Sequence, residues 1–224
     1  MKIDIITVHP PLLESFFSHS MVNRSIQRGF LELHIHNLRD YSNNAHRSVD
    51  DYPYGGGPGM VLSLEPLSNC LDHLISISKP DDIILLTPDG KTLNQGLANE
   101  LSSKNHLILV CGHYKGVDDR LRELYISREI SIGDYVLTGG EIPAAVLVDA
   151  TIRLIPGVLN DESSALSDSF QNGLLSEPIY TRPSVFRGIS VPAILLSGNF
   201  KAIDEWRIQA SLEKTKKNRP DLLE

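Results

Sequence analysis

Three short segments of the chain combine glycine or proline with apolar residues: LLTPDG (85–90), VCGHYKGVD (110–118) and SIGDYVLTGGEIP (131–143). Glycine permits positive φ and has no Cβ, so another molecule can approach such a backbone closely. The segments fit neither the dinucleotide-binding nor the P-loop pattern. Main-chain hydrogen-bonding groups between apolar walls suit a nucleoside better than a free phosphate. Taken singly, each segment is explained at least as well by an ordinary glycine turn.

Two charged residues of interest lie outside these segments. Asp168 lies in the polar DSF stretch, and Arg153 lies near the end of the apolar run 142–155. The residues alone favour structural roles. Asp168 is then a helix N-cap or a solvated loop residue, and Arg153 a cation at a helix C-terminus, where the helix dipole favours it.

Metal and disulfide chemistry find little support in the sequence. The alternating stretch LELHIHN (31–37) places His34 and His36 on one strand face. Without a third ligand in the pattern, we interpret this face as facing solvent rather than binding a metal. Cys70 and Cys111 lie far apart, with no C-x-x-C and no histidine at ligand spacing. They indicate small buried apolar residues, so we expect no metal site and no disulfide framework.

The elements that position these groups alternate along the chain. Strand-like runs cover 2–7, 31–37, 82–87 and 106–111, with helix-like intervals between them. This order indicates an α/β domain with a largely parallel sheet. DDIILLTP and HLILVCG are almost continuously apolar, as expected of strands covered by helices on both faces. Ligands in such sheets bind at the carboxyl ends of the strands.

Four helices and one long loop complete the expected N-terminal domain. Helices are predicted at 64–76, 94–102, 117–124 and 142–155. The last is apolar almost all round, so it should be buried in the domain or against another subunit. The segment 40–60 is too polar and too rich in glycine and proline for regular structure, and loops of this length are usually functional or disordered.

The C-terminal part of the chain differs in composition. NDESSALSDSFQNGLLSEPIY (160–180) is polar and predicts a flexible linker that orders on binding. An amphipathic helix is expected at 199–218, so the chain divides into a domain at 1–159, the linker, and a small helical domain at 181–224. From residue 181 onward the chain has eight basic and five acidic residues. A basic tail on an acidic body suits a selective binder of a polyanion, although a solvated charged helix explains the tail equally well.

Length and charge set broad limits on the class of protein. A chain of 224 residues with 41% apolar residues can fill one substantial core and a smaller appendage. No window reaches the ~18 uncharged apolar residues that span a bilayer, so we expect a cytoplasmic protein without a membrane partner. The net charge of −7 argues against indiscriminate coating of nucleic acid.

Five longer motifs, taken together, point to one family. RSVDDYPYGGGPGM, LVCGHYKGVD, SIGDYVLTGGEIPA, RLIPGVL and DSFQNGLLSEPIYTRP follow each other along the chain, and the match continues to the closing RPDLLE. The chain closely resembles the bacterial tRNA (guanine-N1)-methyltransferases of the SPOUT superfamily. The resemblance implies an S-adenosyl-L-methionine donor, a homodimer, and a parallel sheet with a deep C-terminal trefoil knot, a rare exception to the rule against threaded chains. The implied reaction is methylation of N1 of the guanosine at tRNA position 37, just 3′ of the anticodon.

The resemblance also assigns roles to individual residues. Guanine N1 carries a proton at neutral pH, so methyl transfer needs a base. Asp168 matches the family's proposed base, and burial on RNA binding would raise its pKa. Arg153 matches the arginine that stabilises negative charge on guanine O6. Both would complete a pocket formed with the donor-binding loops of the other protomer. The implied donor contacts are Leu86, Thr87, Pro88, Gly112, Tyr114, Ile132, Gly133, Tyr135, Leu137, Gly139, Gly140 and Pro143.

The same resemblance implies an RNA-binding surface. The basic C-terminal domain would grip the anticodon stem, and the target base must leave its stack before its N1 edge can be reached. The residues implied to hold the target guanosine and the preceding guanosine are His46, Arg47, Asp50, Pro58 and Gly59.

One position departs from the family pattern. Many relatives read C-G-R-Y-E-G where this chain reads CGHYKG (111–116), so Lys115 replaces a glutamate associated with donor handling and magnesium. The sequence therefore leaves the magnesium requirement open. A lysine beside a sulfonium is mildly repelled unless it points to solvent or to RNA phosphate.

Two other functions agree with the same motifs. A non-catalytic RNA-binding protein could have kept the knotted pocket, and a ribose 2′-O-methyltransferase of the same superfamily would act on a hydroxyl. Turnover separates the first alternative from the implied reaction, and the position of the added methyl group separates the second.

Overall fold

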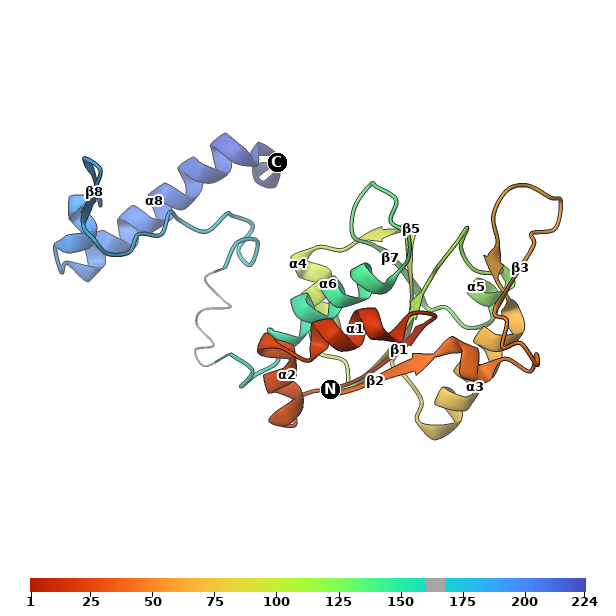
Figure 1. Cartoon of the computed structure of the whole chain (residues 1–224). Coiled ribbons are helices and arrows are strands. Elements are labelled where there is room, and N and C mark those ends of the chain that lie inside the picture. Colours follow the sequence, from red (N-terminus) through yellow and green to blue (C-terminus); the bar gives the residue numbers. More distant parts are fainter. Residues whose placement is uncertain (160–167) are drawn as a thin grey trace. The chain divides into compact units, whose positions relative to one another are not determined.

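The structure is a computed structural model that describes residues 1–159 and 168–224. The chain forms two compact units, Met1–Asn160 and Asp161–Glu224, which are described separately below (Figure 1). The predicted linker 160–180 thus falls almost entirely within the second unit. Its residues 160–167 lie outside the described part of the chain.

The N-terminal unit is built on a five-stranded sheet with the strand order β2-β1-β6-β5-β7. All neighbouring strands in it run parallel, which confirms the predicted α/β class. The bounds are β1 Lys2–Thr7, β2 Glu32–Asn37, β5 Asp82–Thr92, β6 His106–Cys111 and β7 Arg128–Ser131. Two short strands, β3 Asp50–Asp51 and β4 Val61–Leu62, pair antiparallel outside this sheet.

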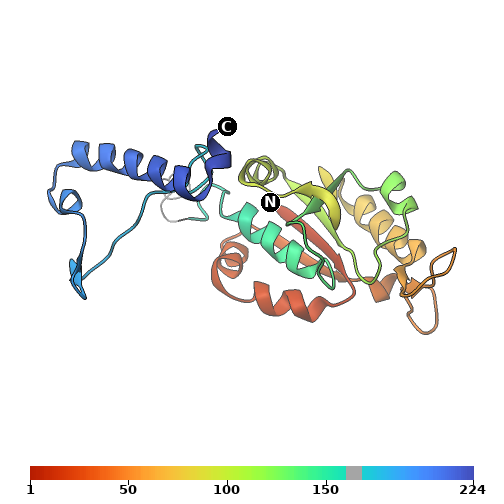
Figure 2. The same cartoon turned by 90° about the horizontal axis from the view of Figure 1, so that it is seen from above.

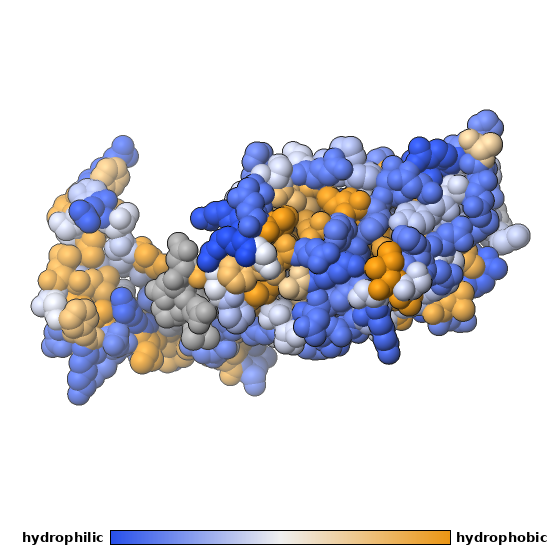
Figure 3. Space-filling view, turned by 90° about the horizontal axis from the view of Figure 1, so that it is seen from below, coloured by the Kyte–Doolittle hydropathy of each residue, from blue (hydrophilic) through white to orange (hydrophobic). Residues whose placement is uncertain are grey.

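Helices cover both faces of the sheet and form two hydrophobic cores. One core gathers α1 Pro10–Phe17, α2 Ser20–Gln27, α4 Gln95–Ser102 and α6 Glu141–Ile152. The other gathers the 3-10 helix η1 Leu38–Tyr41, α3 Leu64–Ile77 and α5 Arg120–Leu124 (Figures 1 and 2). Successive residues of β6 alternate between the two cores, which explains why that strand is continuously apolar. On the surface drawn in Figure 3, hydrophobic residues emerge in separate areas among hydrophilic ones.

Two of the predicted helices are confirmed by α3 and α4, and two others are shorter than predicted. The side chain of Asn94 caps α4 by accepting a hydrogen bond from the Leu97 N–H at 2.9 Å. The predicted helix 117–124 begins only at Arg120, because the Asp118 N–H donates to the Leu62 carbonyl at 3.1 Å. The predicted helix 142–155 ends at Ile152.

The expectation that His36 faces solvent is wrong. His36 Nε2 lies 2.7 Å from Asp4 Oδ1, His106 Nε2 lies 2.7 Å from Asp4 Oδ2, and Lys2 Nζ lies 3.1 Å from the same Oδ2. Burial alone would raise the pKa of Asp4, but these hydrogen bonds lower it far below its usual range. His34 remains exposed and contacts Glu32 at 2.8 Å.

The C-terminal unit contains one long helix, α8 Phe200–Asn218, which confirms the predicted helix and is capped by Asn199 (Figure 2). The helix buries only part of its apolar residues, since Ile203 is buried whereas Phe200 and Ile208 are exposed. Two polar residues, Ser211 and Thr215, are also buried. Among its described residues, this unit also contains a hairpin of β8 Val185–Phe186 and β9 Ile189–Ser190 and the 3-10 helices η2 Ala193–Leu196 and η3 Pro220–Leu223.

The polar residues of α8 are buried because part of the predicted linker packs against the helix. The Leu175 N–H donates to Thr215 Oγ1 at 2.9 Å, and the Ser211 hydroxyl donates to the Leu175 carbonyl. Lys214 Nζ donates to the Ser176 carbonyl at 2.8 Å. Among the described residues of both units, no helix combines the length and apolar character needed to cross a membrane.

Candidate functional site

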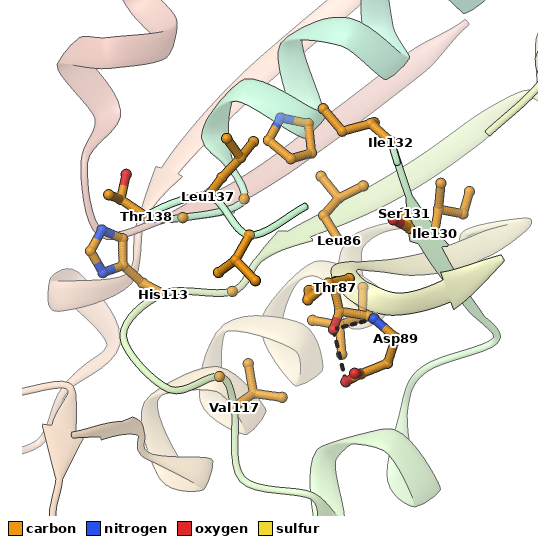
Figure 4. Close-up of a pocket in the computed structure, with 18 of the residues that line it drawn as sticks. Leu86, Thr87, Asp89, His113, Val117, Ile130, Ser131, Ile132, Leu137 and Thr138 are labelled. Carbon is orange, nitrogen blue, oxygen red and sulfur yellow. Dashed lines mark hydrogen bonds between the residues drawn. The ribbon is translucent and has the colours of Figure 1, made fainter. Parts of the chain in front are cut away.

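A cavity of about 410 Å³ opens at the carboxyl ends of β6 and β7, beside the point where β5 is interrupted (Figure 4). Its volume falls in the range of small-molecule sites, roughly 300–1,000 Å³. All twelve residues predicted to contact the donor line this cavity. The structure thus brings together three segments that are far apart in the sequence.

The first wall is formed by an excursion of β5, which we call the β5 excursion and define as residues 87–90. Leu86 and Lys91 both pair with Ile130 of β7, so the four residues between them leave the ladder. Gly90 folds back so tightly that an added Cβ would lie 2.4 Å from the backbone of Glu129 and Ile130. Only glycine fits at this position.

A hydrogen bond within the β5 excursion fixes its shape. Thr87 Oγ1 donates to Asp89 Oδ2 at 3.1 Å, and the Asp89 N–H approaches Thr87 Oγ1 at 3.4 Å (Figure 4). Both residues line the cavity. The conformation of this wall therefore depends on where the Asp89 side chain is held.

The other two walls touch through their main chains. The Gly140 N–H donates to the Gly112 carbonyl at 2.7 Å, and an added Cβ on Gly140 would lie 2.7 Å from Cys111 Cα. An added Cβ on Gly112 would lie 3.3 Å from the Leu86 carbonyl oxygen. Tyr114 adopts φ of 60°, an uncommon conformation for a residue other than glycine. Glycine is needed at position 140 because the start of α6 and the end of β6 meet backbone to backbone.

Two histidines and a buried carboxylate lie beside this wall. His113 Nδ1 accepts a hydrogen bond from the Tyr114 N–H at 2.9 Å, so a neutral His113 carries its proton on Nε2. Its ring centroid lies 4.9 Å from that of His9. Glu141 is buried and accepts a hydrogen bond from the Thr7 hydroxyl at 2.6 Å. The wall therefore offers main-chain groups and apolar side chains to a ligand, with polar side chains at one edge.

The residues predicted to hold guanosine lie outside the cavity, on the loop between η1 and α3. Arg47 is exposed and pairs with Asp40, whereas Gly59 has φ of +95° and lies against the side chain of Lys115. The Lys115 N–H donates to the Met60 carbonyl at 3.0 Å. Since Lys115 also lines the cavity, it connects the cavity with this loop. The other predicted residues between η1 and α3 are the exposed His46 and Pro58 and the half-buried Asp50, which belongs to β3.

Comparison with known proteins identifies the family. A family model described as tRNA (Guanine-1)-methyltransferase TrmD matches residues 1–224. The chain belongs to the TrmD family. It is 57% identical over 224 residues to the tRNA (guanine-N(1)-)-methyltransferase of Flavobacterium psychrophilum, with both chains covered completely.

Further relatives carry the same name. The chain is 56% identical over 224 residues to the tRNA (guanine-N(1)-)-methyltransferase of Bacteroides thetaiotaomicron, again over the whole of both chains. It is 55% identical to that of Cytophaga hutchinsonii over 222 residues, which are 99% of this chain and 94% of the relative. Membership of the TrmD family confirms the predicted resemblance and makes the chain a methyl-transferring enzyme.

The two predicted catalytic residues belong to different units of this TrmD-family chain. Arg153 is the C-cap of α6 in the N-terminal unit and is half-buried. This position also agrees with the simpler interpretation of Arg153 as a cation at a helix C-terminus. Asp168 lies in an irregular part of the C-terminal unit and is half-buried. Their catalytic roles therefore remain predictions.

Eleven further residues line the cavity without having been predicted. Ten of them lie within or directly beside the three glycine-containing segments, so the segments themselves were the available signal. The exception is Arg122, which comes from α5. These eleven are Leu85, Asp89, His113, Lys115, Gly116, Val117, Arg122, Ile130, Ser131, Val136 and Thr138.

Proposed function

We propose that this TrmD-family chain transfers the methyl group of S-adenosyl-L-methionine to N1 of guanosine at position 37 of tRNA. The observation that carries this proposal is the convergence of all twelve predicted donor contacts on one cavity. Gly112 and Gly140 line this cavity. Leu86 and Leu137 offer apolar contact (Figure 4). When bound, the donor supplies an electrophilic methyl group.

Asp168 and Arg153 would carry out the proton and charge chemistry. Guanine N1 must lose its proton as the methyl group arrives, and a carboxylate that becomes buried against RNA is a stronger base than one in water. Arg153 would stabilise the negative charge that moves to guanine O6. Arg153 is the C-cap of α6, and Gly140 and Pro143 at the other end of this helix line the cavity.

A homodimer is part of the same proposal. Leu12 and Phe16 on α1 and Ile142 and Val146 on α6 are exposed, and α1 packs against α6 (Figure 1). An exposed apolar face shared by two packed helices is what a second copy of the chain would cover. Val146→Glu should therefore yield a monomer in sedimentation measurements, with loss of methyl transfer. A variant that stays dimeric and active would contradict this arrangement.

The trefoil knot also belongs to the proposal. After β7 at the edge of the sheet, the chain returns to the end of β6, where the Gly140 N–H bonds to the Gly112 carbonyl. Because β5 lies between β6 and β7 in the sheet, we expect this return to cross β5, and threading of the chain at this crossing would form the knot. To test whether the crossing entangles the chain, the rate of refolding after chemical denaturation is measured for the unaltered chain and for a variant cut between residues 116 and 120. An entangled chain should refold slowly, and the cut variant should not.

Features outside the cavity support tRNA as the substrate. Tyr52 and Tyr54 are exposed on the glycine-rich loop, where aromatic rings can stack on unpaired bases. The C-terminal unit carries the excess of basic residues from 181 onward. Both features suit recognition of a base swung out of the anticodon loop and of the neighbouring phosphates.

The deciding experiment incubates the chain with labelled donor and two tRNA transcripts, one with guanosine and one with adenosine at position 37. Label should enter only the guanosine transcript, and equal labelling would overturn the proposal. Mass analysis of the modified nucleoside distinguishes methylation of the base from that of the ribose. Repeating the assay with a chelator determines whether magnesium is needed.

A variant separates catalysis from binding. Asp168→Ala should keep donor affinity and lose turnover, because the proposed base acts on the guanosine and not on the donor. Asp204→Ala is the matched control, since Asp204 is an exposed acidic residue of the same unit that pairs with Arg207 at 3.1 Å. If Asp168→Ala keeps turnover, the base is another group. If the unaltered chain binds donor and tRNA without turnover, it is a non-catalytic RNA-binding protein.

A further inference from the structure

Arg122 in α5 contacts three carboxylates from three different parts of the N-terminal unit. Its Nη2 lies 3.0 Å from Asp89 Oδ2, its Nη1 lies 2.7 Å from Asp119 Oδ1, and its Nε lies 3.1 Å from Glu129 Oε2. Asp89 is part of the β5 excursion, Asp119 precedes α5, and Glu129 lies in β7. Every nitrogen of the guanidinium is thus used, and each of the three partners comes from a different element.

The contact with Asp89 connects Arg122 to the cavity wall. Asp89 Oδ2 accepts hydrogen bonds from both Thr87 Oγ1, at 3.1 Å, and Arg122 Nη2. Thr87, Asp89 and Arg122 all line the cavity. Arg122 therefore holds the same oxygen atom that fixes the shape of the β5 excursion.

The strand ladder does not hold this segment. Pairing between β5 and β7 stops after Leu86 and resumes at Lys91. Asp89 is also largely exposed, with 71% of its side chain accessible, so packing alone does not fix it. Within the described residues, the ion pair with Arg122 is the contact that connects the Asp89 side chain to the rest of the domain.

The charges make Arg122 necessary for this arrangement. One guanidinium lies among three carboxylates, and all three would repel one another without it. Glu129 and Asp119 are fixed by a strand and by a helix start, whereas Asp89 is on the excursion. Loss of Arg122 should therefore displace Asp89 and, with it, Thr87.

We propose that Arg122 is a positioning residue, which holds the β5 excursion in the conformation that binds the methyl donor. This inference rests on the proposed function, because it takes the cavity as the donor site. It differs from a second explanation, in which the guanidinium acts on the donor directly through its charge. The two explanations predict different results for donors of different charge.

The experiment measures calorimetric dissociation constants of Arg122→Met for S-adenosyl-L-methionine, which carries a sulfonium cation, and for S-adenosyl-L-homocysteine, which carries a neutral thioether. If the competent conformation falls to roughly a tenth of the population, both constants should rise about tenfold. The KM for the donor should rise similarly, while kcat at saturating donor stays within about twofold, since the bound state is unchanged. If the charge of Arg122 acts directly, its removal should favour the cationic donor over the neutral one.

Two further variants serve as controls. Arg120→Met removes an arginine of the same helix that pairs with Asp118 at 2.7 Å and does not line the cavity, so donor affinity should remain within about twofold. Asp89→Asn should weaken both ligands, and Asp89→Asn combined with Arg122→Met should weaken them no more than the stronger single change, because both act through one contact.

Each outcome decides the matter. Equal weakening of both ligands, a higher donor KM and non-additivity with Asp89→Asn support the positioning role. Unchanged constants in Arg122→Met, or tighter binding of the cationic donor alone, overturn it while leaving the proposed function intact. If the unaltered chain binds neither ligand, the proposed function fails and this inference fails with it.

Discussion

Replacing Gly140 by alanine should damage the cavity at the point where two of its walls meet. The added Cβ would lie 2.7 Å from Cys111 Cα and 2.9 Å from the Gly112 nitrogen. Both neighbours are main-chain atoms, so neither can turn away as a flexible side chain would. Relief requires the start of α6 and the end of β6 to move apart.

The size of the effect follows from these distances. Carbon atoms in contact prefer about 3.5–4.0 Å, so the two segments must separate by roughly 1 Å. The hydrogen bond from the Gly140 N–H to the Gly112 carbonyl, now 2.7 Å, would then exceed the usual limit. Overpacking costs about 1–3 kcal/mol and a broken buried hydrogen bond about 1–3 kcal/mol. We expect a loss of roughly 2–6 kcal/mol and, at about 2–4 °C per kcal/mol for a chain of this size, a fall in Tm of roughly 4–24 °C.

Thermal unfolding and calorimetric titration with S-adenosyl-L-homocysteine measure this prediction. Gly140→Ala should lower the Tm and weaken the ligand more than about tenfold, because the displaced walls bind it. Gly96→Ala is the matched control. It lies in α4, where the nearest atom to an added Cβ is Asn94 Oδ1 at 3.4 Å. That substitution should be neutral or stabilise by up to ~1 kcal/mol.

A Gly140→Ala variant with the Tm and ligand affinity of the unaltered chain would refute the reasoning, since the walls would then not be in fixed main-chain contact. A variant that loses stability but keeps its affinity would show that this contact supports the fold and not the cavity.

Three other substitutions have expected outcomes. Asp4→Asn should cost about 3 kcal/mol at pH 7 in chemical denaturation, because a buried carboxylate paired with two imidazoles is removed. The pKa of Asp4 is lower in the folded than in the unfolded chain, so the stability that Asp4 contributes is present above about pH 4 and is lost as the pH falls. The difference in stability between Asp4→Asn and the unaltered chain should therefore shrink in acid. Thr215→Val should destabilise the C-terminal unit by about 1–3 kcal/mol and speed hydrogen exchange of the Leu175 amide, which would lose its acceptor at 2.9 Å. Asn94→Ala should cost about 1 kcal/mol in thermal unfolding through loss of the α4 cap, and an unchanged Tm would contradict that assignment.

The sequence predicts most of the sheet because its central strands carry a strong signal. Strands β5 and β6 are nearly continuous apolar runs, and burial on both faces requires this. Strand β7, Arg128–Ser131, was not predicted, because its four residues include two charged ones and a single apolar residue. It lies at the edge of the sheet, where burial selects less strongly for apolar residues.

Long-range polar contacts could not be predicted from the sequence. Asp4 meets His36 and His106 at sequence separations of 32 and 102, and no local spacing announces either pair. Arg122 reaches Asp89 across 33 residues for the same reason. In the predicted linker, low hydrophobicity suggested flexibility. Among its described residues, Leu175 forms hydrogen bonds with the buried hydroxyl groups of Thr215 and Ser211 in α8. Composition indicates how much apolar area a segment can bury, and hydrogen bonds such as those between Leu175 and α8 do not depend on apolar area.

Much of the cavity wall is main chain, and this limits how the enzyme could escape an inhibitor. A compound that binds the peptide groups around Gly112, Gly139 and Gly140 uses atoms that every amino acid possesses. A substitution there leaves those atoms in place, and at Gly140 it also drives a side chain into the neighbouring strand end. Resistance would have to arise at side chains that line the cavity, such as Lys115 or Arg122. A compound that does not contact these side chains would leave few substitutions that could cause resistance.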